Sequence, residues 1–297
     1  YGFNKSHAVS YSILSFQCAW LLNYYPAEWM AAFLDKEPEH KKEKAIGIAK
    51  SLGFKTAPLD VNTSGKVWEI SGDGKTLIQP LTSIKGLGDS AMDQILEHRP
   101  FKKVEDFLFH EFITYSKLNK KALDVLCRAG ALKSLQDERF TGAKHFWSAI
   151  ACDRPRKLKD LAVNIAAYKE EGDFSTAERI QYLTDLTGIF PINLVMKDKT
   201  LSDLNDAGVP PISEYDPELK AVWFIPRKVN VRKTKNDKSY YVIEAVDLNN
   251  MITQIRCWGA NPERDHIQIN RPYVATLQYN DQWGFSTRSI YHNLRPL

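Results

Sequence analysis

Hydrophobic positions near the start of the chain recur with helical spacing. From Val9 to Leu21 most apolar residues fall on one broad side, which predicts a helix buried along that side. A second helix is predicted over AEWMAAFLDKEPE, because Pro26 stands in the first turn, where no N–H donor is needed. A third is predicted over KKEKAIGIAKSL, and Gly53 after it suits a left-handed cap.

The pattern then changes several times along the chain. VWEIS and KTLIQPL flank a Gly-Asp-Gly turn at 72–74, and an Asp-Gly pair between apolar runs predicts a β-hairpin. Helical spacing returns over 81–135 and continues with few landmarks over 137–200. The stretch DAGVPPISEYDP carries three prolines and one glycine, so it is interpreted as a linker.

Alternating patterns dominate the last part of the chain. Five strand-like runs occur in AVWFIPRKVNV, SYYVIEAVD, MITQIRCW, PYVATLQYN and WGFSTRSIY, with ANPERDHI as a short helical insert between the third and the fourth. Five strands with one interposed helix predict a small Greek-key barrel of the OB type. The predicted fold class is therefore multidomain α+β: an all-α first region with a β hairpin, a helix-hairpin-helix module, and a C-terminal five-stranded OB-type barrel. The predicted boundaries are 1–80, 81–135 for the helix-hairpin-helix module, 136–205 for a helical connector, 206–217 for the linker and 218–297 for the barrel.

Composition narrows the class of protein only slightly. The 297 residues are 43% hydrophobic and 26% charged, which is ordinary for a soluble chain of two or three domains. The formal net charge is only +4, so the positions of the cations matter more than their number. Four cysteines without CxxC spacing indicate a reduced, cytoplasmic protein, and no apolar run reaches the roughly 20 residues of a membrane span.

The turn IKGLG at 84–88 is the first stretch with recognisable chemistry. Two glycines allow the backbone to approach a phosphate closely, and the next helix would aim its N-terminal amides at that phosphate. We interpret the turn as a helix-hairpin-helix grip on the DNA backbone; the alternative is a tight turn in which the glycines only serve geometry. The predicted DNA-binding residues are Lys85, Gly86, Leu87, Gly88 and Ser90.

The β region supplies a second candidate. Its first hairpin is rich in cations and lies among aromatic residues, a mixture that suits single-stranded nucleic acid because charge follows phosphates and rings stack on bases. The alternative is that the aromatics face inward and the loop lysines are only solvated. The predicted binding residues are Arg227, Lys228, Arg232, Lys233, Lys235, Lys238 and Trp258.

No complete catalytic motif is present in the sequence. HExxH, GxxxxGK[ST], GxSxG and an Asp-x-Asp pair for two metal ions are all missing, and the histidines lack ligand spacing. No catalytic or metal-binding residue is therefore predicted. The chain alone is expected to be inactive.

The opening of the chain carries a family resemblance. GFNKSHAVSYS followed by SFQCAWLLNYYPAEWMAAFL closely resembles the fingers region of bacterial replicative DNA polymerase III alpha subunits, the C family of DNA polymerases. PLDVN, SIKGLGDSAMDQIL, PFKKVEDFL and LNKKALDVLCRAGAL follow in the family's order. The resemblance is strong over 1–135, and over 218–297 it rests on architecture.

The resemblance implies roles that the residues alone do not. It makes 1–80 the fingers, with nucleotide-binding residues Asn4, Lys5, Ser6, His7 and Tyr11. In the family, palm aspartates hold Mg²⁺, so the chain is expected to be a C-terminal piece whose palm lies on an N-terminal part or a partner chain of a bacterial or phage enzyme. The family also carries a sliding-clamp peptide, for which QYLTDL at 181–186 is the nearest match.

The implied function is the C-terminal portion of a DNA-directed DNA polymerase that binds the incoming nucleotide, primer–template and single-stranded DNA. Two alternatives remain open at this stage: a non-catalytic DNA-binding module, and a scaffold that binds other replication proteins. Salt dependence distinguishes these two, because phosphate contacts release counterions and a pure scaffold makes none.

Overall fold

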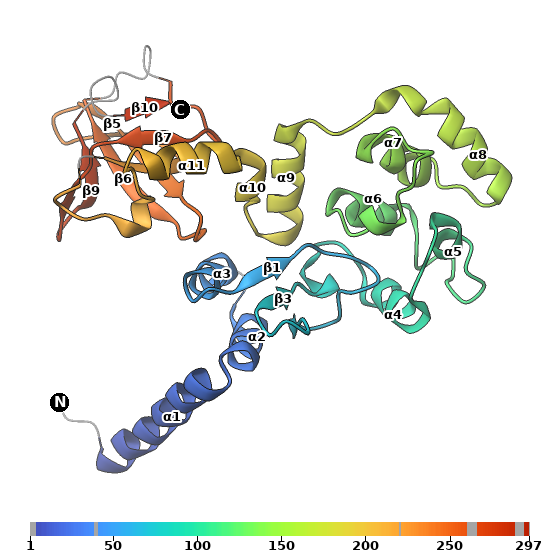
Figure 1. Cartoon of the computed structure of the whole chain (residues 1–297), viewed down its shortest axis with the longest axis horizontal. Coiled ribbons are helices and arrows are strands. Elements are labelled where there is room, and N and C mark those ends of the chain that lie inside the picture. Colours follow the sequence, from blue (N-terminus) through green and yellow to red (C-terminus); the bar gives the residue numbers. More distant parts are fainter. Residues whose placement is uncertain (1–3, 39–40, 220, 260–265, 289–293, 297) are drawn as a thin grey trace. The chain divides into compact units, whose positions relative to one another are not determined.

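The computed structural model describes residues 4–38, 41–219, 221–259, 266–288 and 294–296. It divides into two compact units (Figure 1). The first contains residues 1–45 and 52–189, and the second contains residues 46–51 and 190–297.

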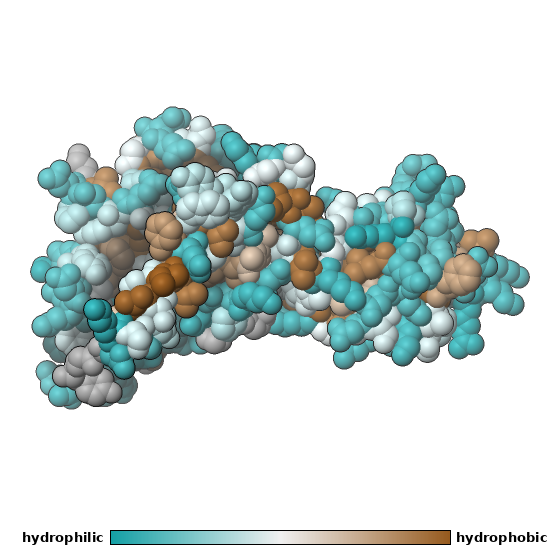
Figure 2. Space-filling view, turned by 90° about the horizontal axis from the view of Figure 1, so that it is seen from below, coloured by the Kyte–Doolittle hydropathy of each residue, from teal (hydrophilic) through white to brown (hydrophobic). Residues whose placement is uncertain are grey.

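The first unit begins with two helices, α1 (Lys5–Tyr24) and α2 (Pro26–Lys36), as the hydrophobic pattern predicted. Met30 and Leu34 on α2 are buried, and Pro26 occupies its first turn. The predicted burial of α1 is wrong, because none of its residues is buried. Figure 2 shows apolar side chains on the surface in the region of this helix. Its exposed apolar residues include Val9, Ile13, Leu14, Phe16, Trp20 and Leu21.

A small sheet follows in the order β1-β3-β2. Its strands are β1 (Lys55–Ala57), β2 (Glu69–Ile70) and β3 (Thr76–Ile78). The antiparallel pairing of β2 with β3 confirms the predicted hairpin. The carboxylate of Asp73 holds its turn by accepting hydrogen bonds from the backbone of Lys75 and from Thr76.

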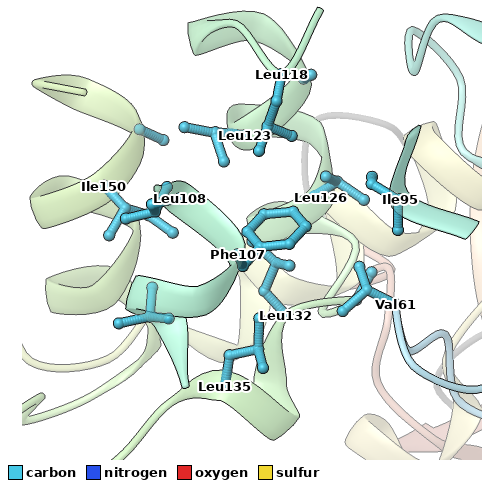
Figure 3. Packing of buried hydrophobic residues seen from close by; sticks show 14 of the residues in the cluster. Val61, Ile95, Phe107, Leu108, Leu118, Leu123, Leu126, Leu132, Leu135 and Ile150 are labelled. Atoms are coloured by element: carbon cyan, nitrogen blue, oxygen red, sulfur yellow. The ribbon is translucent and has the colours of Figure 1, made fainter. Parts of the chain in front are cut away.

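The remainder of the first unit is helical and packs around one apolar core. Phe107 lies at the centre of this core, surrounded by Leu108, Leu126, Leu132 and Ile150 (Figure 3). The ring is fully buried, and such packing is the main source of fold stability. The elements are η2 (Leu81–Ser83), α4 (Asp89–His98), α5 (Val104–Leu108), α6 (Lys120–Arg128), η3 (Lys133–Leu135), α7 (Ala143–Trp147), the π-helix η4 (Ser148–Cys152), α8 (Leu158–Ala167), η5 (Lys169–Glu171) and α9 (Thr176–Thr187).

The second unit combines short helices with one sheet. Part of α3 (Lys42–Ser51), α10 (Ile192–Val195), α11 (Asp198–Asp206) and η6 (Ile212–Glu214) accompany the strands. The predicted linker contributes Ile212 to the core of this unit, and the carbonyl of Pro210 accepts a hydrogen bond from Trp223 at 3.0 Å. The middle of the predicted linker, residues 210–215, therefore packs onto the sheet.

The sheet has seven strands in the order β10-β7-β4-β5-β6-β9-β8, so the predicted five-stranded barrel is not confirmed. The fourth predicted strand is split in two, and a further strand lies beyond the fifth. The predicted helical insert falls largely on 260–265, outside the described residues. The strands are β4 (Val222–Lys233), β5 (Ser239–Val246), β6 (Thr253–Trp258), β7 (Tyr273–Ala275), β8 (Gln278–Asn280), β9 (Gly284–Thr287) and β10 (Leu294–Pro296).

The sheet must curl because of how the split strand connects its two sides. β7 pairs with β4, β8 pairs with β9, and only Thr276 and Leu277 lie between β7 and β8. The three Cα–Cα steps from the end of β7 to the start of β8 span at most about 11 Å, so these distant positions in the strand order lie close in space. One pair, β6 with β9, is parallel, and the other pairings are antiparallel.

Candidate nucleic-acid interface

The turn before α4 divides cleanly into an apolar inside and a polar outside. Ile84 is buried in the core, and the amide of Leu87 donates to the carbonyl of Ile84 at 3.2 Å. Gly86 has φ +89°, a conformation that glycine adopts without strain. Gly88 precedes α4 in extended conformation, and a Cβ atom there would meet nothing within 4 Å. Lys85, Gly86, Gly88 and Ser90 are exposed, whereas the predicted Leu87 is half-buried and packs against the core.

A neighbouring helix adds a cation to this turn. The Cε atom of Lys121 lies 3.6 Å from the position of a Cβ on Gly86. Lys121 follows Lys120 in the first turn of α6, where the Asn119 side chain accepts a hydrogen bond from the Ala122 amide at 3.0 Å. The sequence analysis missed Lys121, because no local signal relates it to Gly86. The N-terminal amides of α4 and this ammonium group together suit a phosphate, whereas the carboxylate of Asp89 opposes one.

The second candidate surface is one face of the curled sheet, here called the outward face. On β5 and β6 the residues Tyr241, Ile243, Ile255 and Cys257 are buried in the core. On β4, Val229 packs against the same core, so the neighbours of these residues along each strand point the other way. The strand registers then align three rows across this face. The rows are Lys228–Glu244–Gln254, Asn230–Val242–Arg256–Ser286 and Arg232–Tyr240–Trp258.

Aromatic rings and cations lie side by side on the outward face. The ring centroids of Tyr240 and Trp258 are 4.6 Å apart. Trp258 also lines a surface hollow with the exposed Trp283. This hollow extends to Tyr279, which the register places in the row of Phe285 and Ile255 on the other face. The guanidinium of Arg256 lies 6.0 Å from the ring centroid of Trp283 and donates to the carbonyl oxygen of that residue. Charge beside exposed rings is the arrangement that single-stranded nucleic acid requires.

The predicted cations of the first sheet hairpin separate into three groups. Lys228 and Arg232 lie on the outward face. Arg227 does not, because the register shifts between Pro226 and Lys228 and the Arg227 guanidinium lies 4.8 Å from the ring centroid of Phe190. The remaining three are at the exposed tip, where Lys233 pairs with Asp237 at 2.8 Å: Lys233, Lys235 and Lys238.

The predicted nucleotide-binding residues occupy the first two turns of α1. Asn4 is the N-cap, and its side chain accepts hydrogen bonds from the amide and hydroxyl of Ser6 at 3.1 and 2.8 Å. Asn4 and Ser6 are thus engaged locally. Lys5 is exposed, and the exposed rings of His7 and Tyr11 lie with their centroids 4.5 Å apart.

Among the described residues, no group of three or more His, Cys, Asp or Glu side chains is placed to hold a metal ion. Within the same part of the chain, no helix has both the length and the apolar character to cross a bilayer.

The predicted clamp peptide lies within α9, where Tyr182 packs against Phe174 with ring centroids 5.3 Å apart.

Comparisons with known proteins agree with the geometry of the first unit. A family model described as a helix-hairpin-helix motif matches residues 53–141. The DNA polymerase III subunit alpha of Thermus aquaticus is 41% identical over 144 residues, covering 46% of this chain and 11% of the relative. That of Pseudomonas fluorescens is 36% identical over 242 residues, covering 74% of this chain and 20% of the relative. The corresponding subunit of Chlamydia muridarum is 32% identical over 204 residues, and 14% of its length is covered. The chain thus spans at most about a fifth of these relatives.

Proposed function

We propose, from the premise that this chain is related to part of the alpha subunit of DNA polymerase III, that it contributes DNA and nucleotide binding to template-directed DNA synthesis. The similarity to these relatives and to the helix-hairpin-helix model confirms the resemblance seen in the sequence. In this proposal the outward face binds the single strand, the turn at 84–88 binds the duplex, and the start of α1 binds the incoming nucleotide. The chemical step belongs to another part of the enzyme.

The outward face of the curled sheet is the observation that carries the proposal. Tyr240 and Trp258 offer stacking surfaces for bases. Arg232 lies in the same row as these rings and Arg256 lies in the neighbouring row, and both would bind phosphates. The parallel pair β6–β9 and the two-residue connection between β7 and β8 support an OB-type arrangement for this sheet. A single template strand is the proposed ligand.

The proposed duplex contact is the turn at 84–88. Its glycines are open to solvent, and Lys85 and Lys121 flank them. Amide groups and ammonium groups bind phosphate without reading bases, which suits an enzyme that must copy every sequence.

The proposed nucleotide contact is the start of α1. Lys5 and His7 would face the triphosphate of the incoming nucleotide, because phosphoryl transfer depends on positioning and on neutralising phosphate charge. Tyr11 would lie next to the nascent base pair. The exposed apolar surface of α1 supports a further part of the enzyme packing there. We assign that place to the palm, on an N-terminal part or a partner chain.

In this proposal Mg²⁺ is bound by the palm, as the family resemblance implies. The sliding clamp is retained as a proposed partner through residues 181–186.

The test is primer extension with this chain, a palm-containing part of the enzyme, and their mixture, with Mg²⁺ and all four nucleotides. Extension is expected only in the mixture, and the double variant Lys5→Ala/His7→Ala should slow it strongly. A matched control is Lys36→Ala/His98→Ala, which removes the same residue types elsewhere in the first unit. Salt-sensitive DNA binding without extension in any mixture would leave a DNA-holding module and end the catalytic proposal. Absence of both would favour a scaffold.

A further inference from the structure

A second cationic site lies in the first unit, on the loop before α6 and the turn before α8. Arg154 is only 8% exposed, and its Nη1 atom donates to the carbonyl oxygen of Tyr115 at 2.6 Å. Its guanidinium lies 3.8 Å from the centroid of the Tyr115 ring, and that of Arg156 lies 5.3 Å from the same centroid. Both guanidinium groups therefore lie next to the same tyrosine ring.

The charge of this pair is not neutralised within the described part of the chain. No carboxylate there forms an ion pair with Arg154 or Arg156, and the Nε atom of Arg154 is buried without a hydrogen-bond partner. Burial lowers the pKa of Arg154, and Tyr115 offsets this only in part. The nearby Asp160 accepts from the backbone amides of Arg156 and Lys157, where it caps α8. A buried cation without a counter-charge is costly, so proteins normally pair it.

Further cations, Lys120 and Lys121, lie at the start of α6. Lys121 lies beside Gly86, and Lys120 and Lys121 line one hollow together with Cys152, two residues before Arg154. Asp124, which also lines the hollow, is engaged by Arg128 at 3.0 Å and by the indole of Trp147 at 2.7 Å. Two lysines therefore line this hollow, and its carboxylate is already engaged by neighbouring groups.

We propose that Arg154 and Arg156, held on Tyr115, bind a phosphate of duplex DNA whose backbone runs along Lys120 and Lys121 from the turn at 84–88. The inference rests on the proposed duplex binding of this unit. Arginine suits the role because its planar guanidinium matches the geometry of phosphate oxygens. Tyr115 and the buried Arg154 fix the site, and the exposed Arg156 completes it.

The test measures duplex affinity of the whole chain across a salt series by fluorescence anisotropy. Arg156→Gln should weaken binding about threefold to tenfold and lower the slope of log affinity against log salt by about 0.9, the value for one lost phosphate contact. Tyr115→Ala should weaken binding although no charge is removed. The matched control Lys169→Gln removes one exposed charge on η5 of the same unit and should leave both quantities unchanged.

Thermal melting of each variant shows whether a loss of affinity reflects a loss of folding. If Arg156→Gln behaves like Lys169→Gln while Gly88→Ala still weakens duplex binding, the inference is overturned and the proposed function stands. If the unaltered chain does not bind duplex at all, both are overturned.

Discussion

The indole of Trp258 lies against the phenol ring of Tyr240, with centroids 4.6 Å apart and planes inclined by 31°. The two residues are direct partners in the β5–β6 register, and Arg232 is the partner of Tyr240 on the other side. A supported aromatic pair next to a guanidinium presents a ring surface and a charge that need little reordering when a nucleotide binds.

Replacing Trp258 with alanine should weaken binding of single-stranded DNA. The expected loss is about 1–3 kcal/mol, the range for one stacked base. It is measured by anisotropy of a labelled oligothymidine. Phe112→Ala is the matched control, because this exposed ring belongs to the first unit and is not part of the sheet. Equal affinities for both variants would contradict the assignment of the outward face.

Cations on the outward face should make the affinity for single-stranded DNA depend on salt concentration. Arg232→Gln should lower the salt slope of single-strand binding by about 0.7, as expected for one phosphate contact. Lys233 follows it in sequence but pairs with Asp237, so Lys233→Gln should have a smaller effect on the slope. The comparison uses affinities over a salt series. The assignment fails if the two variants change the slope equally.

The sequence predicted features that depend on local chemistry. The hairpin at 72–74, the first turn of α2 and the left-handed Gly53 follow from residues that lie side by side in the chain. The sequence did not predict that α1 is exposed, because exposure depends on what packs against a helix and not on the spacing of its apolar residues. The outward face was only partly predictable, since the register shift that turns Arg227 away depends on pairing with β5. The contact of Lys121 with Gly86 is long-range and has no local signal.

The two glycines of the turn at 84–88 should respond differently to alanine. Gly86→Ala should lower the free energy of unfolding by about 1 kcal/mol, because φ is +89° there. Gly88→Ala should leave stability unchanged, since its φ is −77° and the space around it is open. It should nevertheless weaken duplex binding by holding the backbone away from the phosphate. Denaturant titration and anisotropy separate the two effects, and unchanged duplex affinity of Gly88→Ala would contradict a phosphate contact at this turn.

Tight packing at Gly47 gives a prediction about the second unit alone. A Cβ atom there would overlap the carbonyl oxygen of Asn249 and lie 2.9 Å from Cγ of Met251. Gly47→Ala should therefore destabilise this unit by about 1–3 kcal/mol, despite the better helix propensity of alanine. Gly72→Ala, where nothing lies within 4 Å, is the control and should change stability little. Denaturant titration provides the measurement, and equal stabilities would show that the loop moves aside at no cost.

Asp73 should make the hairpin of the first unit sensitive to acid. The hydroxyl of Thr76, and then the amides of Lys75 and Thr76, lower the pKa of Asp73 from 3.8 to about 2. A depressed folded-state pKa means that the stabilisation is complete above pH 3.8 and is lost as the pH falls towards about 2. Asp73→Asn removes this titration, so the stability difference between the two proteins should shrink over that interval. NMR titration of the carboxyl carbon checks the pKa directly. A midpoint near 3.8 would show that these hydrogen bonds do not favour the charged form.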